Sequence, residues 1–261
     1  MRTLALLSLL GSLAARAECL SGPRVAVGPR SVQAQCGYGS ADIAAAGSFA
    51  AAAWMTSHTS FIFGHVVTTG STWGGVLNER GHLIAAAQEQ LNDAPGVPSI
   101  AAGGGRVLLA WTTDWTTRAR FLDSNDVFII TDSGSIAHPA RAVWDGSDFF
   151  VIYEEQGAVK SARIGSEERV TIALNARLVD ASASAIVIET AAGFELIANG
   201  SRRTLPIPSG AVAVLGDGFV AWHAGTIGMV RFDGAPVTLA SASSEVKRIA
   251  VAGDVILWND G

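Results

Sequence analysis

Side chains that could act on a ligand stand at the ends of several apolar runs of this sequence. They are Asp114, Trp115, Glu154, Glu155, Glu189 and His223. Two carboxylates facing each other across a glycosidic bond would allow its hydrolysis if they lay roughly 5 Å or about 6.5–9.5 Å apart. A carboxylate beside an aromatic ring would instead suit a bound sugar, which stacks on the ring and hydrogen-bonds to the acid. The sequence alone leaves both interpretations open.

A second group of candidates lies in residues 55–75, which include His58, His65 and Trp73. This segment contains an insertion of roughly 15 to 20 residues compared with the other repeated units described below. Long insertions on a scaffold of short loops often carry function. We therefore predict that His58 and Trp73 help to bind a ligand. The alternative is an extended hairpin that only covers the edge of a sheet.

Other catalytic and metal-binding motifs are absent from the sequence. The five histidines do not form a His-Glu-x-x-His pair, and there is no Gly-x-Ser-x-Gly motif. Residues 123–126 resemble part of a calcium loop but are too few, and they are typical of a plain turn. We expect no metal and no cofactor.

The N-terminus has the pattern of an export signal. Arg2 precedes the apolar residues 4–10, and the small residues Ala15 and Ala17 mark a cleavage site, so residues 1–17 are predicted to be a signal peptide. The apolar run is too short to span a bilayer, and no other run approaches the required length of about 18 residues. We expect a secreted or periplasmic protein without a membrane span.

Removal of Arg2 and Arg16 with the signal peptide takes the formal net charge from −5 to −7. An acidic chain without a basic cluster is not expected to bind nucleic acid. Export also makes a disulfide between the two cysteines, Cys19 and Cys36, chemically reasonable. Two free thiols or a metal pair are the alternatives.

The elements that must position these side chains are repeated hairpins. Six segments share an apolar strand, a turn of Gly, Asp or Ser, and a second strand ending in a large side chain: 42–54, 98–111, 140–155, 176–189, 210–222 and 247–258. Five of them are followed by a second strand pair, at 74–87, 118–130, 159–173, 194–207 and 228–240. The first segment is rich in alanine, but its central Gly47-Ser48 and its likeness to the other copies favour strands over a helix.

The spacing of the large side chains sets the expected architecture. These anchors are Trp54, Trp111, Tyr153, Ile188, Trp222 and Trp258, at intervals of about 40 residues. Four-stranded units with this period are typical of β-propeller blades. The sixth unit lacks its second pair, which residues 24–27 and 31–35 could supply. We predict one all-β domain over residues 18–261, a six-bladed β-propeller whose last blade is closed by N-terminal strands. A β-sandwich is the alternative.

In period and strand pattern the chain resembles the secreted bacterial β-propellers, the class that includes six-bladed sialidase-like and TolB-like rings. The resemblance covers the mature chain but not the specific signatures, since no Ser-x-Asp-x-Gly-x-x-Trp box is present and Trp144-Asp145 falls in a hairpin turn. It implies a scaffold that hosts binding as well as several chemistries, and it selects none of them.

The leading hypothesis is therefore an exported, non-catalytic, monomeric propeller that binds an extracellular glycan or protein. Its binding face would contain the loops that follow the second and fourth strands of each unit. The candidate ligand-binding residues are His58, Trp73, Asp114, Trp115, Glu154, Glu155 and His223. The alternatives are an extracellular glycoside hydrolase that uses the carboxylates of this face, and a purely structural surface module.

Overall fold

Short strands joined by tight turns make up the described chain. The structure is a computed structural model, and it describes residues 41–46, 49–62, 65–77, 83–91, 98–113, 116–132, 140–241, 248–252 and 255–259. These residues contain strands and turns and no helix, which confirms the all-β prediction. The predicted signal peptide, both cysteines and the two N-terminal strands lie outside the described residues.

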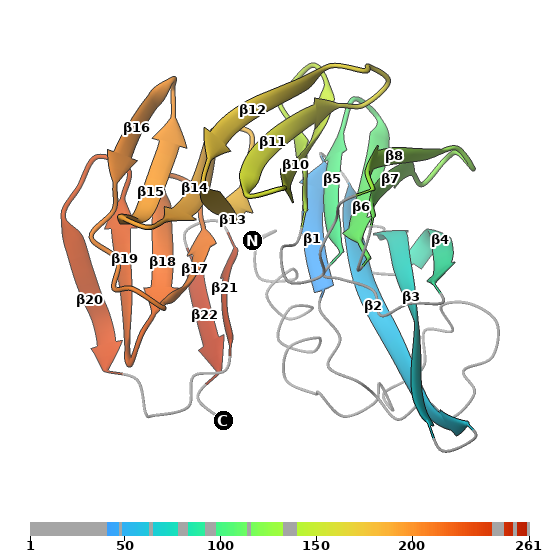
Figure 1. The fold of residues 1–261 in the computed structure, drawn as a ribbon, viewed down its shortest axis with the longest axis horizontal. Helices are drawn as coiled ribbons and strands as arrows, with labels where there is room; N and C mark the ends of the chain where they lie inside the picture. Colours follow the sequence, from blue (N-terminus) through green and yellow to red (C-terminus); the bar gives the residue numbers. More distant parts are fainter. Residues whose placement is uncertain are drawn as a thin grey trace. The chain divides into compact units, whose positions relative to one another are not determined.

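Sheets 1 to 3 each consist of four consecutive strands (Figure 1). Sheet 1 contains β1 (Ala41–Ala46), β2 (Phe49–Ile62), β3 (His65–Leu77) and β4 (Leu83–Leu91). Sheet 2 contains β5 (Ser99–Gly103), β6 (Arg106–Thr112), β7 (Thr117–Phe121) and β8 (Val127–Thr131). Sheet 3 contains β9 (Arg141–Trp144), β10 (Phe149–Glu155), β11 (Ala158–Arg163) and β12 (Arg169–Leu174).

Sheets 4 and 5 repeat the same arrangement, and sheet 6 is a hairpin in the described residues. Sheet 4 contains β13 (Ala176–Ala181), β14 (Ala185–Thr190), β15 (Gly193–Ala198) and β16 (Ser201–Thr204). Sheet 5 contains β17 (Val212–Leu215), β18 (Phe219–His223), β19 (Thr226–Arg231) and β20 (Pro236–Ser241). Sheet 6 contains β21 (Arg248–Ala252) and β22 (Val255–Asn259).

Every sheet is an antiparallel meander, in which each strand pairs with the next one along the chain. The six predicted hairpins are therefore confirmed as the first two strands of the six sheets. The Ala-rich segment forms β1 and β2, which pair from Ala41↔Trp54 to Ala46↔Phe49. Ala51 and Ala53 are fully buried, because small side chains allow the next sheet to pack closely on this one.

The turn at Asp145 shows how the hairpins are closed. The Asp145 carboxylate accepts hydrogen bonds from the backbone N–H groups of Ser147 and Asp148, at 2.8 Å each, and from the Ser147 hydroxyl at 2.9 Å. The bonds from Asp148 and Ser147 hold the pKa of Asp145 below its ordinary value. Gly146 adopts a φ of 106°, which glycine reaches without strain. The Trp144-Asp145 pair is therefore part of a structural turn.

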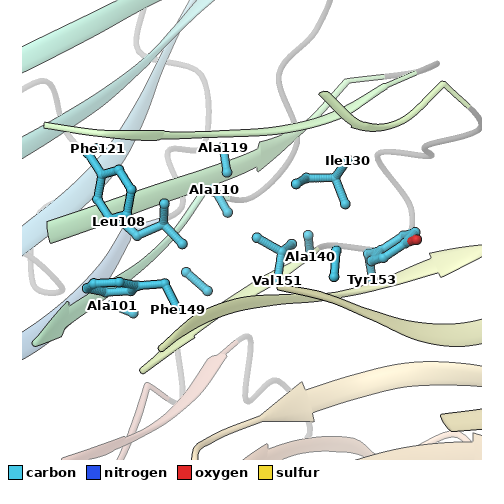
Figure 2. Close-up of a cluster of buried hydrophobic side chains, with 12 residues drawn as sticks. Ala101, Leu108, Ala110, Ala119, Phe121, Ile130, Ala140, Phe149, Val151 and Tyr153 are labelled. Carbon is cyan, nitrogen blue, oxygen red and sulfur yellow. The ribbon is translucent and has the colours of Figure 1, made fainter. Parts of the chain in front are cut away.

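The chain divides into two compact units, residues 1–155 with 161–170 (unit 1) and residues 156–160 with 171–261 (unit 2). In unit 1 the facing sides of sheets 2 and 3 enclose an apolar cluster (Figure 2). Leu108 and Phe121 of sheet 2 meet Phe149, Val151 and Tyr153 of sheet 3. Burying such side chains stabilises the fold by about 1.5–3 kcal/mol each.

Sheet 1 contributes small residues to its contact with sheet 2, and these meet larger side chains such as Leu109 and Trp111. A Cβ atom added at Gly74 of β3 would lie 2.7 Å from Leu122 and 3.2 Å from Leu109, so this glycine allows the close approach of the sheets. In unit 2, sheets 4 and 5 enclose a cluster with Phe194 and Trp222, and sheets 5 and 6 a smaller one with Phe219. Each unit is thus a stack of sheets with apolar layers between them.

A repeated hydrogen bond, here called the inter-sheet cap, joins the first strands of neighbouring sheets. The first strand lies at the edge of its sheet, so its outward N–H groups have no strand partner. Three side chains from a preceding sheet supply the missing acceptors: Asp42 Oδ2 for Ile100 N–H at 2.9 Å, Ser99 Oγ for Ala142 N–H at 3.1 Å, and Asp180 Oδ2 for Leu215 N–H at 2.9 Å.

The three caps occupy equivalent places in the repeat. Each acceptor pairs with the residue just before its sheet's anchor, in the pairs Asp42↔Ala53, Ser99↔Ala110 and Asp180↔Val187. Each donor pairs with the residue two before the anchor of the next sheet, in the pairs Ile100↔Leu109, Ala142↔Val151 and Leu215↔Val220. Neighbouring sheets therefore pack in the same relative position within each of the two units.

Candidate functional site

A row of buried threonines ends sheet 2 on the side that faces sheet 3. Thr112, Thr117 and Thr131 are successive cross-strand partners on β6, β7 and β8, and they are 0%, 1% and 4% exposed. The hydroxyls of Thr112 and Thr117 lie 3.3 Å apart, and the Thr131 hydroxyl donates to Oε1 of Glu155, the last residue of β10 in sheet 3. We call these four residues the threonine–glutamate row. It fixes a carboxylate at the end of sheets 2 and 3.

A tight turn follows the row between β6 and β7. Thr113 and Thr116 close it through a backbone bond from Thr113 N–H to Thr116 O of 2.8 Å and a bond from Thr116 N–H to Thr113 Oγ1 of 3.0 Å. The two residues between them, Asp114 and Trp115, are ligand-binding candidates that lie outside the described residues. Thr113 and Thr116 flank both candidates in the sequence.

The bond between Thr131 and Glu155 also establishes which ends of the strands meet. Thr131 ends the fourth strand of sheet 2, and Glu155 ends the second strand of sheet 3. The end of the fourth strand of sheet 2 and the end of the second strand of sheet 3 therefore lie together. We call this the ligand end. Glu154 precedes Glu155 there, and both are half-buried.

His223 has the corresponding place in unit 2, as the last residue of β18. Its side chain is half-buried, and its Nε2 is enclosed without a hydrogen-bond partner among the described residues. Its register partners are Val212 and Ile227, so no acid lies directly opposite it.

Two other carboxylates of unit 2 are held by arginines. Glu189 forms an ion pair with its cross-strand partner Arg177, and Glu195 forms one with Arg202. The Arg202 guanidinium, and then the Thr190 hydroxyl, hold the pKa of Glu195 below its ordinary value. These contacts give Glu189 and Glu195 a role in binding neighbouring strands together.

The inserted segment is a continuation of β2 and β3. The two strands pair without interruption from Ala50↔Leu77 to Ile62↔His65, so the insertion lengthens this hairpin. Ligand binding by His58 and Trp73 stays a prediction. His58 pairs with Thr69 on this extension. Trp73 pairs with Trp54 at its base, and the two half-buried rings stack in parallel with centroids 6.1 Å apart. One face of the Trp73 ring is therefore occupied by Trp54.

The structure adds residues that sequence reasoning had not singled out. Thr112, Thr117 and Thr131 belong to segments that read as turns or strand ends, and only the strand register places them in one row. Among the described residues no group of three His, Cys, Asp or Glu side chains could hold a metal ion. No helix that could cross a membrane occurs in the part of the chain that the structure describes.

Comparisons with known proteins add little to this description. No protein-family model and no curated protein sequence matches the chain. Among solved structures, apo AztD from Citrobacter koseri aligns with a TM-score of 0.39 and 9% sequence identity, over 76% of this chain and 71% of that chain. A similarity of this size supports no inference about fold or function.

Proposed function

We propose that this chain is an exported, non-catalytic six-bladed β-propeller that binds an extracellular partner at its ligand end. Support for the propeller comes from the repeat. Five four-stranded meanders and one hairpin follow each other along the chain, and inter-sheet caps at equivalent positions occur in both units. Residues 24–27 and 31–35 then complete the sixth blade. A closed ring gives each blade two neighbours to cover its faces.

The anchors provide a second line of support for the ring. Trp111, Tyr153 and Trp222 each pack toward the preceding sheet of their own unit. Trp54 holds the equivalent place on sheet 1 and lies on the face opposite Ala53, which packs on sheet 2. In a closed ring the first sheet also has a preceding neighbour, and Trp54 points toward that position.

Export is supported by the N-terminal pattern, with cleavage near Ala17 and a mature chain in a secreted or periplasmic location. A disulfide between Cys19 and Cys36 then holds the new N-terminus in place. These elements belong to the proposal, because they lie outside the described residues.

The threonine–glutamate row carries the proposal of binding. It holds the half-buried Glu155 carboxylate at the end of sheet 2 at which Thr113 and Thr116 follow the row. Asp114 and Trp115, which stand between these two threonines in the sequence, are proposed to complete the site. A fixed acceptor near an aromatic side chain suits a carbohydrate, because hydroxyl groups donate to the acid while the ring stacks on a sugar face. An extracellular protein with a hydroxyl-rich or amide-rich surface is the second kind of partner. Glu189 forms an ion pair with Arg177. This favours a binding protein over a glycoside hydrolase in which Glu189 and Glu155 would be the two catalytic carboxylates.

The binding proposal is tested by glycan-array and solution-binding measurements on residues 18–261. We expect Glu155→Gln and Trp115→Ala each to weaken binding by about tenfold or more, the loss of one charged hydrogen bond or one stacked ring. Glu168→Gln is the matched control, since it removes the same charge from an exposed turn at the opposite end of sheet 3. Binding that is lost equally in the control, or retained in both test variants, would contradict the assignment.

A further inference from the structure

Three buried polar atoms of sheets 1 and 2 have no hydrogen-bond partner among the described residues. They are Oγ1 of Thr72 on β3, Nε1 of Trp111 on β6 and Nε of Arg118 on β7. Thr72 and Trp111 are both 0% exposed, and Arg118 is half-buried. Folded proteins leave few buried polar groups without a partner, and a bound ion or small molecule is one explanation of such a group.

The strand register places all three side chains between the two sheets. Trp111 and Arg118 are direct cross-strand partners and so lie on the same face of sheet 2. That face packs on sheet 1, because Trp111 belongs to the apolar cluster between these sheets. On sheet 1, an added Cβ at Gly74 would touch Leu109. Thr72 lies two residues along β3 from Gly74 and so faces sheet 2 as well.

The direction of the strands brings the three atoms to one level. Asp42 of β1 lies beside Ile100 of β5, and Ala44 and Ala102 both pack against the cluster between the sheets, so β1 and β5 run the same way. The strands that pair with them, β2 and β6, therefore also run in a common direction. The two-residue step along β3 to the threonine and the two-residue step along β6 to the tryptophan then point to the same end of the interface.

The chemistry of the three groups suits an anion. An indole N–H and a guanidinium only donate hydrogen bonds, whereas a threonine hydroxyl can donate or accept. A bound water molecule would need acceptors for its own two hydrogens, so a site with mostly donors fits an anion better. One guanidinium balances one negative charge, and its planar fork matches a carboxylate.

The equivalent position of sheet 4 shows how a charge at this place is balanced. Arg118 pairs with the anchor Trp111, as Glu195 pairs with the anchor Ile188. The Glu195 carboxylate accepts hydrogen bonds from Arg202 and from the Thr190 hydroxyl. Arg118 forms no ion pair with a described carboxylate. Since partial burial of an unpaired charge is unfavourable, a counterion at Arg118 would stabilise the fold.

The row that contains Arg118 is open to solvent on one side. Its partner on β6, Trp111, is 0% exposed, whereas its partner on β8, Ile129, is 62% exposed. The guanidinium therefore stands between the buried indole and the solvent. An anion that enters from the β8 side would meet the positive charge first.

We propose that Thr72, Trp111 and Arg118 bind the carboxylate of a small dissolved anion. Arg118 balances its charge, while the Trp111 indole and the Thr72 hydroxyl donate hydrogen bonds to its oxygens. This site does not rest on the proposed function, since the threonine–glutamate row lies on the opposite face of sheet 2.

Titration of residues 18–261 with sodium formate tests the proposal, with sodium chloride in a parallel titration. The readout is the ¹H–¹⁵N signal of the Trp111 indole, one of seven tryptophans. We expect this signal to shift and saturate with formate. Arg118→Gln should raise the dissociation constant by about tenfold or more, and Thr72→Val by about threefold or more. Arg231→Gln is the matched control, because it removes the same charge from an exposed position of β19, and it should change the constant by less than about twofold.

A further variant distinguishes a dissolved anion from a carboxylate of the chain itself. Glu89 on β4 is the register partner of Thr72, so its carboxylate is the competing occupant. Glu89→Gln should leave the affinity for formate within about twofold. Formate binding that appears only in Glu89→Gln would show that the chain fills its own site and would overturn the proposal. An unsaturable Trp111 signal in the wild type, a response to chloride alone, or equal losses in Arg118→Gln and Arg231→Gln would overturn it as well.

Discussion

Replacing Asp42 by alanine tests the inter-sheet cap, which links the sheets within each unit. The Asp42 carboxylate accepts from the Ser99 hydroxyl and from Ile100 N–H, both at 2.9 Å. Ile100 is 4% exposed, so its N–H group has little contact with water once the acceptor is lost. A buried N–H group left without a partner costs about 1–3 kcal/mol, and a bond to a charged acceptor contributes about 1.5–3 kcal/mol. We expect Asp42→Ala to lower the free energy of unfolding by about 2–3 kcal/mol.

Urea unfolding followed by tryptophan fluorescence measures this loss, and calorimetry should show a fall in Tm of about 5–10 °C. Asp42→Asn keeps an oxygen acceptor at the same reach and should cost only about 1 kcal/mol. Asp180→Ala removes the equivalent cap in unit 2 and should cost about as much as Asp42→Ala. A loss below about 0.5 kcal/mol in both alanine variants would refute the view that these carboxylates satisfy the edge strands.

Two further predictions concern sheets 4 and 5. Gly228→Ala should destabilise the protein by about 1–3 kcal/mol in urea unfolding, because the added Cβ would lie 2.3 Å from the Trp222 ring. The control is Gly234→Ala, whose added Cβ would have its nearest contact at 3.3 Å and should be nearly neutral. Arg202 lowers the pKa of Glu195 in the folded protein. The ionised carboxylate therefore stabilises the fold at pH values above about 4.3, its pKa in the unfolded chain, and this stabilisation is lost as the pH falls through the lower pKa of the folded state. The stability difference between wild type and Glu195→Gln should accordingly be largest near pH 7 and shrink below about pH 4; a difference that does not change with pH would contradict this role.

Much of the strand pattern could be predicted from the sequence because turn residues and apolar alternation are local signals. Asp145 and Gly146 mark a turn whose chemistry is contained within four residues. The Ala-rich first hairpin was recognised only by comparison with its copies, since alanine itself favours a helix. Residues 55–75 carried no sequence signal that distinguished a loop from a longer hairpin, because threonine, serine and glycine occur in both.

The candidate site depended on information that the sequence does not display. Thr112, Thr117 and Thr131 form a row only because the register of three strands aligns them. Asp180 reaches the position equivalent to Asp42 only because the pairing of β13 with β14 shifts between Leu178 and Asp180. A shift of one residue reverses which face a side chain occupies, so caps and rows of this kind follow from the register and not from composition.

A crystal structure of residues 18–261 would establish whether the sheets form a closed propeller, because it shows how many sheets surround one axis. We expect six four-stranded sheets in a closed ring, with residues 24–27 and 31–35 paired beside β22 as the outer half of the sixth. A sandwich of two sheets, or a sixth sheet that remains a hairpin while the N-terminal residues pair elsewhere, would contradict it.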